Sequence, residues 1–174
     1  MKNNYTLHIL SIAAIGVDAF DLPREKNAII VCAATDKALA DYALPQNTLL
    51  LDFPDVTDGR RAGAFDRAHA EQILCFVRGL SAQVSDVYVC CEQGYSRSPA
   101  VAAALLRMTG RSDRDVWRNP YYQPNPLVYR RLCRASGLFT PRLAVRHKTR
   151  VNKRAYQRAQ SGKPHPYERW QLLL

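Results

Sequence analysis

One stretch of the chain constrains both the fold and the chemistry, because an apolar run, a short loop and a helix-forming run follow one another directly. The run from Val87 to Cys90 is typical of a buried strand, and the Ala/Leu-rich run from Pro99 to Leu106, with proline in its first turn, predicts a helix. The loop between them therefore joins the carboxyl end of a strand to the amino end of a helix. Free backbone N–H groups and the positive end of the helix dipole at such a junction favour an anion and push a nearby thiol toward thiolate.

The residues of this loop suit a phosphate. Cys91 and Arg97 stand six positions apart, although with five cysteines in the chain this spacing alone would carry little weight. Gly94 lies in mid-loop, where the missing Cβ permits a positive φ and a close approach to a ligand. Ser98 adds a hydroxyl beside the thiol. Together with the flanking strand and helix, these residues predict a phosphate-binding loop.

The sequence from Cys91 to Pro99, Cys-Glu-Gln-Gly-Tyr-Ser-Arg-Ser-Pro, resembles the signature loop of cysteine-dependent protein phosphatases of the compact dual-specificity type. Phe53-Pro54-Asp55 after three leucines resembles the acid-bearing loop of that family, and Pro124-Asn125-Pro126 resembles the start of its C-terminal helix. The resemblance covers about residues 5–139 and is strongest in the phosphate-binding loop. It implies a protein tyrosine or dual-specificity phosphatase, a metal-independent hydrolase that forms a phosphocysteine intermediate and needs no cofactor.

The chemistry of the loop residues supports specific roles. Cys91 is the candidate nucleophile, and the loop amides, the helix dipole and the hydroxyl of Ser98 should favour its thiolate. Arg97 can offer two parallel N–H groups to two phosphoryl oxygens, a planar fork that lysine cannot reproduce. The residues expected to bind the substrate, largely through their backbone, are Glu92, Gln93, Gly94, Tyr95, Ser96 and Arg97.

Four side chains in and before the loop have other expected roles. The side chains of Glu92 and Gln93 are expected to point away from the phosphate, and Tyr95 to form part of the pocket rim. Cys90 stands where the family usually has histidine, so a group that helps orient the loop and tune the thiolate is missing. Lowered activity or a less depressed thiol pKa is the expected consequence. Cys90 is interpreted as a small buried strand residue rather than as a trap for the oxidised nucleophile.

A leaving alkoxide or phenoxide needs a proton, and the candidate acids are Asp52, Asp55 and Asp58. Strand alternation places Leu51 and Phe53 on one face and Asp52 on the other, which leaves Asp55 as the first carboxylate of the loop. Asp55 also matches the acid of the family. Its separation from the nucleophile is slightly longer than that type leads us to expect, so Asp58 stays an alternative. The same residue would later activate the water that cleaves phosphocysteine.

Apolar runs elsewhere predict a single α/β domain with a mainly parallel central sheet flanked by helices. An amphipathic helix is expected over residues 65–80, with His69 in a structural role, and shorter helices over 111–118, with Trp117 inward, and over 127–135. Gly110 and Gly137 are expected to end helices. The four expected strands are Leu7 to Leu10, Ala28 to Cys32, Thr48 to Leu51 and Val87 to Cys90.

Length and composition narrow the class of protein. A chain of 174 residues suits one domain of ordinary size. Its five cysteines are scattered without a C-x-x-C pair and it has four histidines, so we expect reduced thiols, no zinc or other metal site, and a cytoplasmic protein. The apolar run at residues 7–15 has only Lys2 as a basic start and contains His8, so we do not expect a signal peptide. No uncharged apolar run is long enough for an integral membrane protein.

The positive charge is concentrated at the C-terminal end. Residues 141–174 contain nine Lys or Arg and one acid, Glu168, for a net charge of +8 out of +10 in the whole chain. We therefore divide the sequence into a phosphatase-like catalytic domain, residues 1–140, and a basic extension, residues 141–174. The extension is expected to be solvated and partly helical, and contact with nucleic acid, anionic lipid or an acidic phosphoprotein stays open.

Three functional hypotheses follow. The first is a phosphatase acting on phosphotyrosine, and on phosphoserine or phosphothreonine, in proteins. The second is a phosphatase of a non-protein polyanion, an RNA 5′ end or a phosphoinositide, recruited by the basic extension. The third, motivated by Cys90 in place of histidine, is a weakly active phosphate-binding module.

Overall fold

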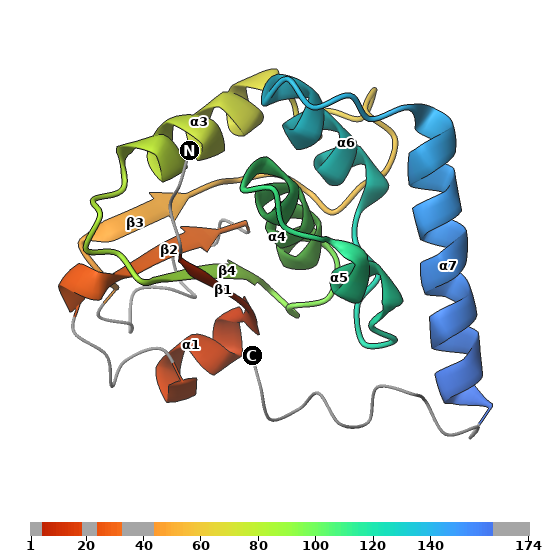
Figure 1. Ribbon diagram of the computed structural model, residues 1–174, viewed down its shortest axis with the longest axis horizontal. Helices are drawn as coiled ribbons and strands as arrows, with labels where there is room; N and C mark the ends of the chain where they lie inside the picture. The colour runs from red at the N-terminus through yellow and green to blue at the C-terminus, as the bar shows by residue number, and fades with distance from the viewer. Residues whose placement is uncertain (1–4, 19–23, 33–43, 162–174) are drawn as a thin grey trace.

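The computed structural model describes residues 5–18, 24–32 and 44–161. They form a parallel four-stranded sheet with strand order β1-β4-β2-β3, flanked by helices, as Figure 1 shows. The predicted single-domain α/β fold is therefore confirmed, and the ends of each predicted strand are displaced by one residue. The strands are β1 (Thr6–Ser11), β2 (Asn27–Val31), β3 (Asn47–Leu50) and β4 (Asp86–Cys91).

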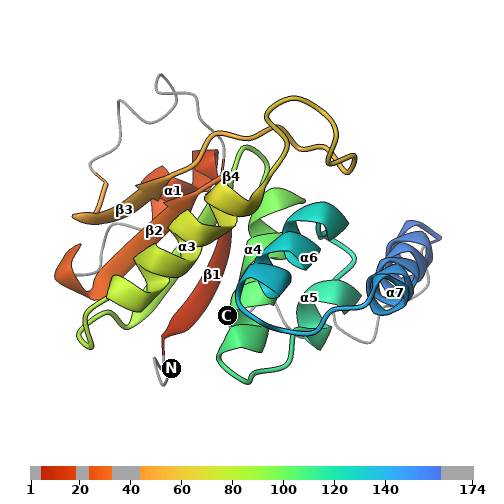
Figure 2. The ribbon, with the colours of Figure 1, turned by 90° about the horizontal axis from the view of Figure 1, so that it is seen from above.

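Helices cover both faces of the sheet (Figure 2). On one face, α1 packs through Ile12 and Ile15 against side chains of β2 and β4. On the other face, α3, α4 and α6 enclose the larger core, and α5 and α7 lie outside them. The helices are α1 (Ile12–Asp18), α3 (Arg67–Gly79), α4 (Arg97–Met108), α5 (Arg114–Arg118), α6 (Pro126–Ala135) and α7 (Arg142–Gln160), with a 3-10 turn at Arg24–Lys26.

The two central strands determine where the phosphate-binding loop lies. Every residue of β2 is buried, which is the pattern of a parallel strand covered on both faces. β4 runs between β1 and β2 and ends at Cys91. The loop that follows therefore leaves the middle of the sheet at its carboxyl edge, where ligands of open α/β sheets commonly bind.

α3 confirms the helix expected over residues 65–80 and the structural interpretation of His69. The N-cap Asp66 accepts a hydrogen bond from the backbone N–H of His69 at 3.0 Å, and the His69 ring contacts the Asp66 backbone N–H in return. His69 Nε2 donates to the carbonyl oxygen of Asp52 at 3.1 Å, and the ring packs beside Phe53 and Phe65. His69 thus joins the start of α3 to the beginning of the segment that follows β3.

The helix expected over residues 111–118 is shorter than predicted and begins at Arg114. Gly110 has a φ of +75°, and the backbone N–H of Arg111 donates to the carbonyl of Leu106 at 2.9 Å. Residues 109–111 therefore terminate α4, which is why they are not available to start α5. Trp117 is buried, as predicted.

The first part of the basic extension is not a solvated tail. α7 packs against α5 and α6, and its Val145 and Ala155 are buried. Lys148 Nζ donates to Asp113 Oδ1 at 2.7 Å, which anchors the helix to the start of α5. Residues 162–174 of the extension lie outside the described part of the chain. Among the helices that are described, none is long and apolar enough to cross a membrane.

Candidate active site

The loop between β4 and α4 closes tightly against the end of β1. Gly94 has a φ of +67°, and a Cβ at this position would lie 2.8 Å from the backbone nitrogen of Ser11. The positive φ would strain any residue with a side chain, and the nearby backbone of Ser11 would obstruct its Cβ. The position therefore requires glycine. The predicted positive φ is confirmed, and the group that Gly94 approaches closely is the backbone of β1.

The thiol of Cys91 lies at the centre of a group of hydrogen-bond donors. Its Sγ is 3.1 Å from Ser98 Oγ, and both residues are buried. Burial by itself raises the pKa of the Cys91 thiol, but hydrogen bonds from the Ser98 hydroxyl and from the backbone N–H groups of Ser98, Ser96 and Tyr95 outweigh it. The net result is a thiol pKa below its usual value, which is the environment of a reactive cysteine.

Arg97 reaches the site from the first turn of α4, and its side chain is only 8 % exposed. Its Nη1 donates to the carbonyl oxygen of Phe53 at 2.9 Å, which fixes the plane of the guanidinium. Its Nε is buried and has no hydrogen-bond partner within the described residues. A buried guanidinium N–H without a partner is costly, so this arrangement favours an added anion that accepts from it.

Glu92 does not point away from the anion site, contrary to the expectation from sequence. Its Oε2 lies 2.9 Å from Arg97 Nη2, and the side chain lines the pocket. The physical reason is charge: the guanidinium has few partners, and the acidic side chain next to the nucleophile is long enough to reach it. The Glu92 side chain is 61 % exposed, so an anion can displace its carboxylate into water at little cost.

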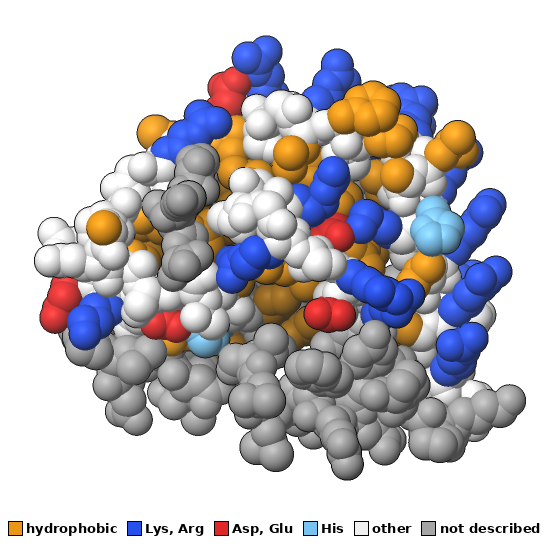
Figure 3. Space-filling model, viewed as in Figure 1, with side chains coloured by type: hydrophobic (Ala, Val, Ile, Leu, Met, Phe, Trp, Pro, Cys, Tyr) orange, Lys and Arg blue, Asp and Glu red, His pale blue; other side chains and the backbone are white. Residues whose placement is uncertain are grey.

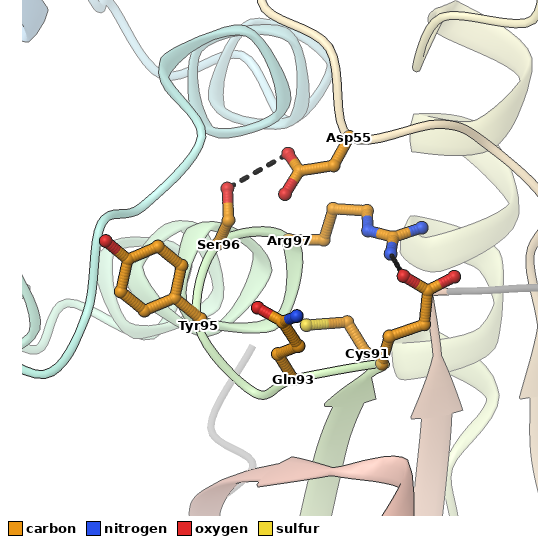
Figure 4. A pocket seen from close by; sticks show the side chains of 7 residues that line it. Asp55, Cys91, Gln93, Tyr95, Ser96 and Arg97 are labelled. Atoms are coloured by element: carbon orange, nitrogen blue, oxygen red, sulfur yellow. Dashed lines mark hydrogen bonds and ion pairs between the residues drawn. The ribbon is translucent and has the colours of Figure 1, made fainter.

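Asp55 is the carboxylate that the fold brings to the pocket. Figure 4 shows it on the segment after β3, with its side chain directed toward the same space as Cys91 and Arg97. Its Oδ1 accepts hydrogen bonds from Ser96 Oγ at 2.9 Å and from Asn125 Nδ2 at 2.7 Å. These two donors fix the direction of the carboxyl group while the rest of the residue stays exposed.

The other two candidate acids lie elsewhere. Asp58 is exposed and is absent from the pocket lining, and it pairs with Arg60 at 2.9 Å. This pairing lowers the pKa of Asp58, which disfavours the protonated form that a general acid needs. Asp52 is exposed on the opposite side of the strand end from the buried Leu51 and Phe53, as strand alternation predicted. The geometry therefore favours Asp55.

Asn125 is a site residue whose role the sequence did not reveal. Its side-chain oxygen caps α6 by accepting from the backbone N–H of Leu127 at 2.9 Å and of Val128 at 3.2 Å. Its amide nitrogen donates to Asp55 and to the carbonyl of Val56. An Asn before Pro at a helix start is a recognisable N-cap signal, but no local pattern indicates which distant carboxylate its NH₂ group faces.

The cysteines near the nucleophile lie on different faces of the sheet. Cys90 belongs to the core under α1, and burial raises its pKa to about 12, with a smaller contribution from Cys91. It is thus the small buried residue that was expected. Cys32 lies on the same face as Cys91, and its backbone N–H donates to the carbonyl of Cys90 at 2.7 Å. Burial raises the pKa of Cys32 well above the usual value, so only the Cys91 thiol is activated.

These groups enclose a pocket of about 220 Å³. Buried donors occupy the base of the pocket, and Asp55 lies at its side. Tyr95 lies at the margin of the pocket, and its side chain points away from Cys91 in Figure 4. Such an arrangement can hold a tetrahedral oxyanion between a thiolate and a carboxyl group. The residues that line the pocket are Asp55, Cys91, Glu92, Gln93, Tyr95, Ser96 and Arg97.

Comparison of the chain with protein-family models, with curated proteins and with solved structures gave no match.

Proposed function

We propose that the protein is a metal-independent phosphomonoester hydrolase of the protein tyrosine phosphatase type, acting through a phosphocysteine intermediate. The observation that carries the proposal is the pairing of two features in one pocket. The Cys91 thiol has a lowered pKa, and Arg97, which lines the same pocket, has a buried Nε without a hydrogen-bond partner within the described residues. The Cys91 thiolate can act as a nucleophile, and the Arg97 guanidinium has an N–H group free to bind an anion. Together they suit an electrophile that carries negatively charged oxygens, as a phosphoryl group does.

In the first step, Cys91 Sγ attacks phosphorus while the bond to the alcohol or phenol oxygen breaks. The loop N–H groups and Arg97 bind the three equatorial phosphoryl oxygens, over which negative charge is spread in the transition state, and hold them in line with the sulfur and the leaving oxygen. Asp55, held by Ser96 and Asn125, gives its proton to the leaving oxygen. The products of this step are the free alcohol and phosphocysteine.

In the second step, water attacks the phosphocysteine, and the ionised Asp55 accepts a proton from that water. The sulfur–phosphorus bond breaks, inorganic phosphate leaves, and the Cys91 thiolate returns. Ser98 is positioned for this stage, because its hydroxyl lies 3.1 Å from the sulfur and can stabilise the departing thiolate. The resemblance in sequence extends the expected substrates to phosphotyrosine, phosphoserine and phosphothreonine in proteins.

The intermediate offers a direct test. Wild-type protein is mixed with excess aryl phosphate and quenched in acid, and the peptide that contains both adjacent cysteines is examined by mass spectrometry. We expect one phosphoryl group on the wild type and on Cys90→Ser, and none on Cys91→Ser. Labelling that survives in Cys91→Ser, or that is absent from a wild type which releases phosphate continuously, would contradict the proposed mechanism. Labelling without continued release would favour the phosphate-binding module.

A further inference from the structure

α7 carries five arginines spaced four residues apart, and we call them the arginine ladder. All five are exposed, and no acidic residue occurs anywhere in Arg142–Gln160. Within the described residues, no carboxylate forms an ion pair with any of them. The residues of the ladder are Arg142, Arg146, Arg150, Arg154 and Arg158.

Such a ladder opposes helix formation. Like charges four residues apart in a helix destabilise it by about 0.2–0.5 kcal/mol per pair, and the ladder contains a run of these pairs. The repulsion extends to α6, where burial and then the positive charges of Arg142, Arg131 and Arg134 lower the pKa of Arg130. Figure 3 shows Lys and Arg side chains along the edge of the molecule formed by α7. A partner with repeated negative charges would relieve this repulsion.

The packing of α7 disfavours a membrane as that partner. A helix that lies on a bilayer needs an apolar face free to enter it. The apolar side of α7 is instead largely used inside the protein, where Val145 and Ala155 are buried and Asn152 Nδ2 donates to the carbonyl of Tyr122 at 2.8 Å. Leu143, which is 74 % exposed at the amino end of the helix, is a single side chain and does not form an apolar face. What α7 offers to a partner is therefore mainly positive charge, which suits a soluble polyanion.

Contacts connect α7 to the margin of the pocket. The segment held by Asn152 continues to Gln123, whose backbone N–H donates to the carbonyl of Tyr95 at 2.9 Å. Tyr95 lines the pocket, and Tyr156 lies on α7 between Arg154 and Arg158 of the ladder. Burial and then the charge of Tyr156 raise the pKa of Tyr95. An aromatic side chain is therefore present both at the pocket margin and on the helix that carries the ladder. Aromatic rings next to a cationic track are how proteins commonly bind unpaired bases.

We propose that the substrate is a single-stranded nucleic acid that carries a terminal phosphate monoester. The terminal phosphate binds in the loop of Cys91, the adjoining base stacks at Tyr95 and Tyr156, and the following backbone phosphates lie along the arginine ladder. The inference rests on the proposed function, because the bond broken is the one between phosphorus and the terminal sugar oxygen. That oxygen receives its proton from Asp55, and water then releases phosphate from the sulfur.

The test compares two variants of the full chain that each lose three positive charges. The ladder variant is Arg146→Gln, Arg150→Gln and Arg154→Gln. The control variant, Lys26→Gln, Arg67→Gln and Arg78→Gln, changes exposed residues of the 3-10 turn and α3, which Figure 2 shows on the other side of α4 and α6 from α7. Substrates are a 5′-phosphorylated single strand of about 10 nucleotides, a nucleoside 5′-monophosphate, a phosphotyrosine peptide and an aryl phosphate.

We expect the wild type to have a higher kcat/KM for the oligonucleotide than for the nucleoside monophosphate or the phosphopeptide. If each lost cation contacts one backbone phosphate, the ratio of kcat/KM for oligonucleotide over aryl phosphate should fall about 100-fold in the ladder variant at 0.1 M salt. The same ratio should not change in the control variant. A wild type that hydrolyses aryl phosphate but prefers the peptide, or treats oligonucleotide and monophosphate alike, would overturn this inference while leaving the proposed function intact.

A binding measurement separates the two proposals further, because it does not need turnover. Fluorescence anisotropy with the labelled oligonucleotide and Cys91→Ser protein gives the dissociation constant over a range of salt concentrations. The logarithm of the dissociation constant is plotted against the logarithm of the salt concentration. The slope of this plot should be smaller by about 2 when Cys91→Ser is combined with the three ladder substitutions than in Cys91→Ser alone. An unchanged slope, or stronger binding to phosphoinositide vesicles than to the oligonucleotide, would refute nucleic acid as the partner.

Discussion

Replacing Gly94 by alanine tests whether the phosphate-binding loop depends on its close contact with β1. At a φ of +67° an L-residue costs about 1–2 kcal/mol. The new Cβ would also lie 2.8 Å from Ser11 N, 2.9 Å from Leu10 C and 3.0 Å from Leu10 O, all backbone atoms that cannot rotate away. Crowding of this kind adds about 1–3 kcal/mol, so Gly94→Ala should lower the free energy of unfolding by about 2–5 kcal/mol.

Gly137 provides a matched control for this substitution. Its φ is +82°, but a Cβ there would meet no atom within 4 Å. Gly137→Ala should therefore cost only the backbone strain, about 1–2 kcal/mol. Urea denaturation of both variants measures the difference, and phosphate release should fall in Gly94→Ala alone because its loop must shift. Equal losses of stability in the two variants would refute the claim that the loop is held against the β1 backbone.

Three further substitutions test individual contacts of the pocket. Ser98→Ala removes a hydrogen bond to the Cys91 sulfur, so the pKa of that thiol should rise. The pH midpoint of alkylation of Cys91 by iodoacetamide should then move upward, and an unchanged midpoint would exclude the hydroxyl as a source of the low pKa. Asn125→Asp keeps an acceptor for the α6 cap but replaces the amide donor to Asp55 by a like charge, so the alkaline limb of the pH–rate profile should move to higher pH. Asn125→Ser removes the donor without adding a charge, so it should move that limb in the same direction by less, and an equal displacement in the two variants would exclude charge repulsion as the cause. Glu92→Gln should lower the inhibition constant of inorganic phosphate, because a neutral amide competes less with the anion for the loop arginine, and a higher constant would show that the carboxylate supports the site.

The parts of this protein that were predictable from sequence are those fixed by local patterns. Parallel strands buried on both faces appear as continuous apolar runs, and β2 and β4 were located from them. Gly94 in mid-loop indicated the positive φ, because few other residues adopt that conformation. The strand, the loop and the helix N-terminus are contiguous in sequence, so local patterns were sufficient to predict the arrangement around Cys91.

The contacts that were missed depend on how separate elements pack against one another. Asn125 faces Asp55 across 70 positions of the chain, and only the packing of α6 brings them together. Glu92 was expected to point outward, and it turns inward because Arg97 has an available N–H group. The charge of residues 141–174 predicted a solvated, partly helical extension; the helix is present as α7, but a few side chains spaced along one face, Val145 and Ala155 among them, are enough to dock it. In each case the decisive partner belongs to another element.

Steady-state hydrolysis of a small aryl phosphate in the presence of EDTA tests the central claim most directly. The set to compare is the wild type, Cys91→Ser, Asp55→Ala and Asp58→Ala, the last as a control from the same loop outside the pocket. The proposed mechanism predicts turnover that EDTA does not affect, loss of turnover in Cys91→Ser, a decrease of about 10²–10⁴-fold in Asp55→Ala, and no change in Asp58→Ala. Turnover that persists in Cys91→Ser, or that EDTA abolishes, would contradict it.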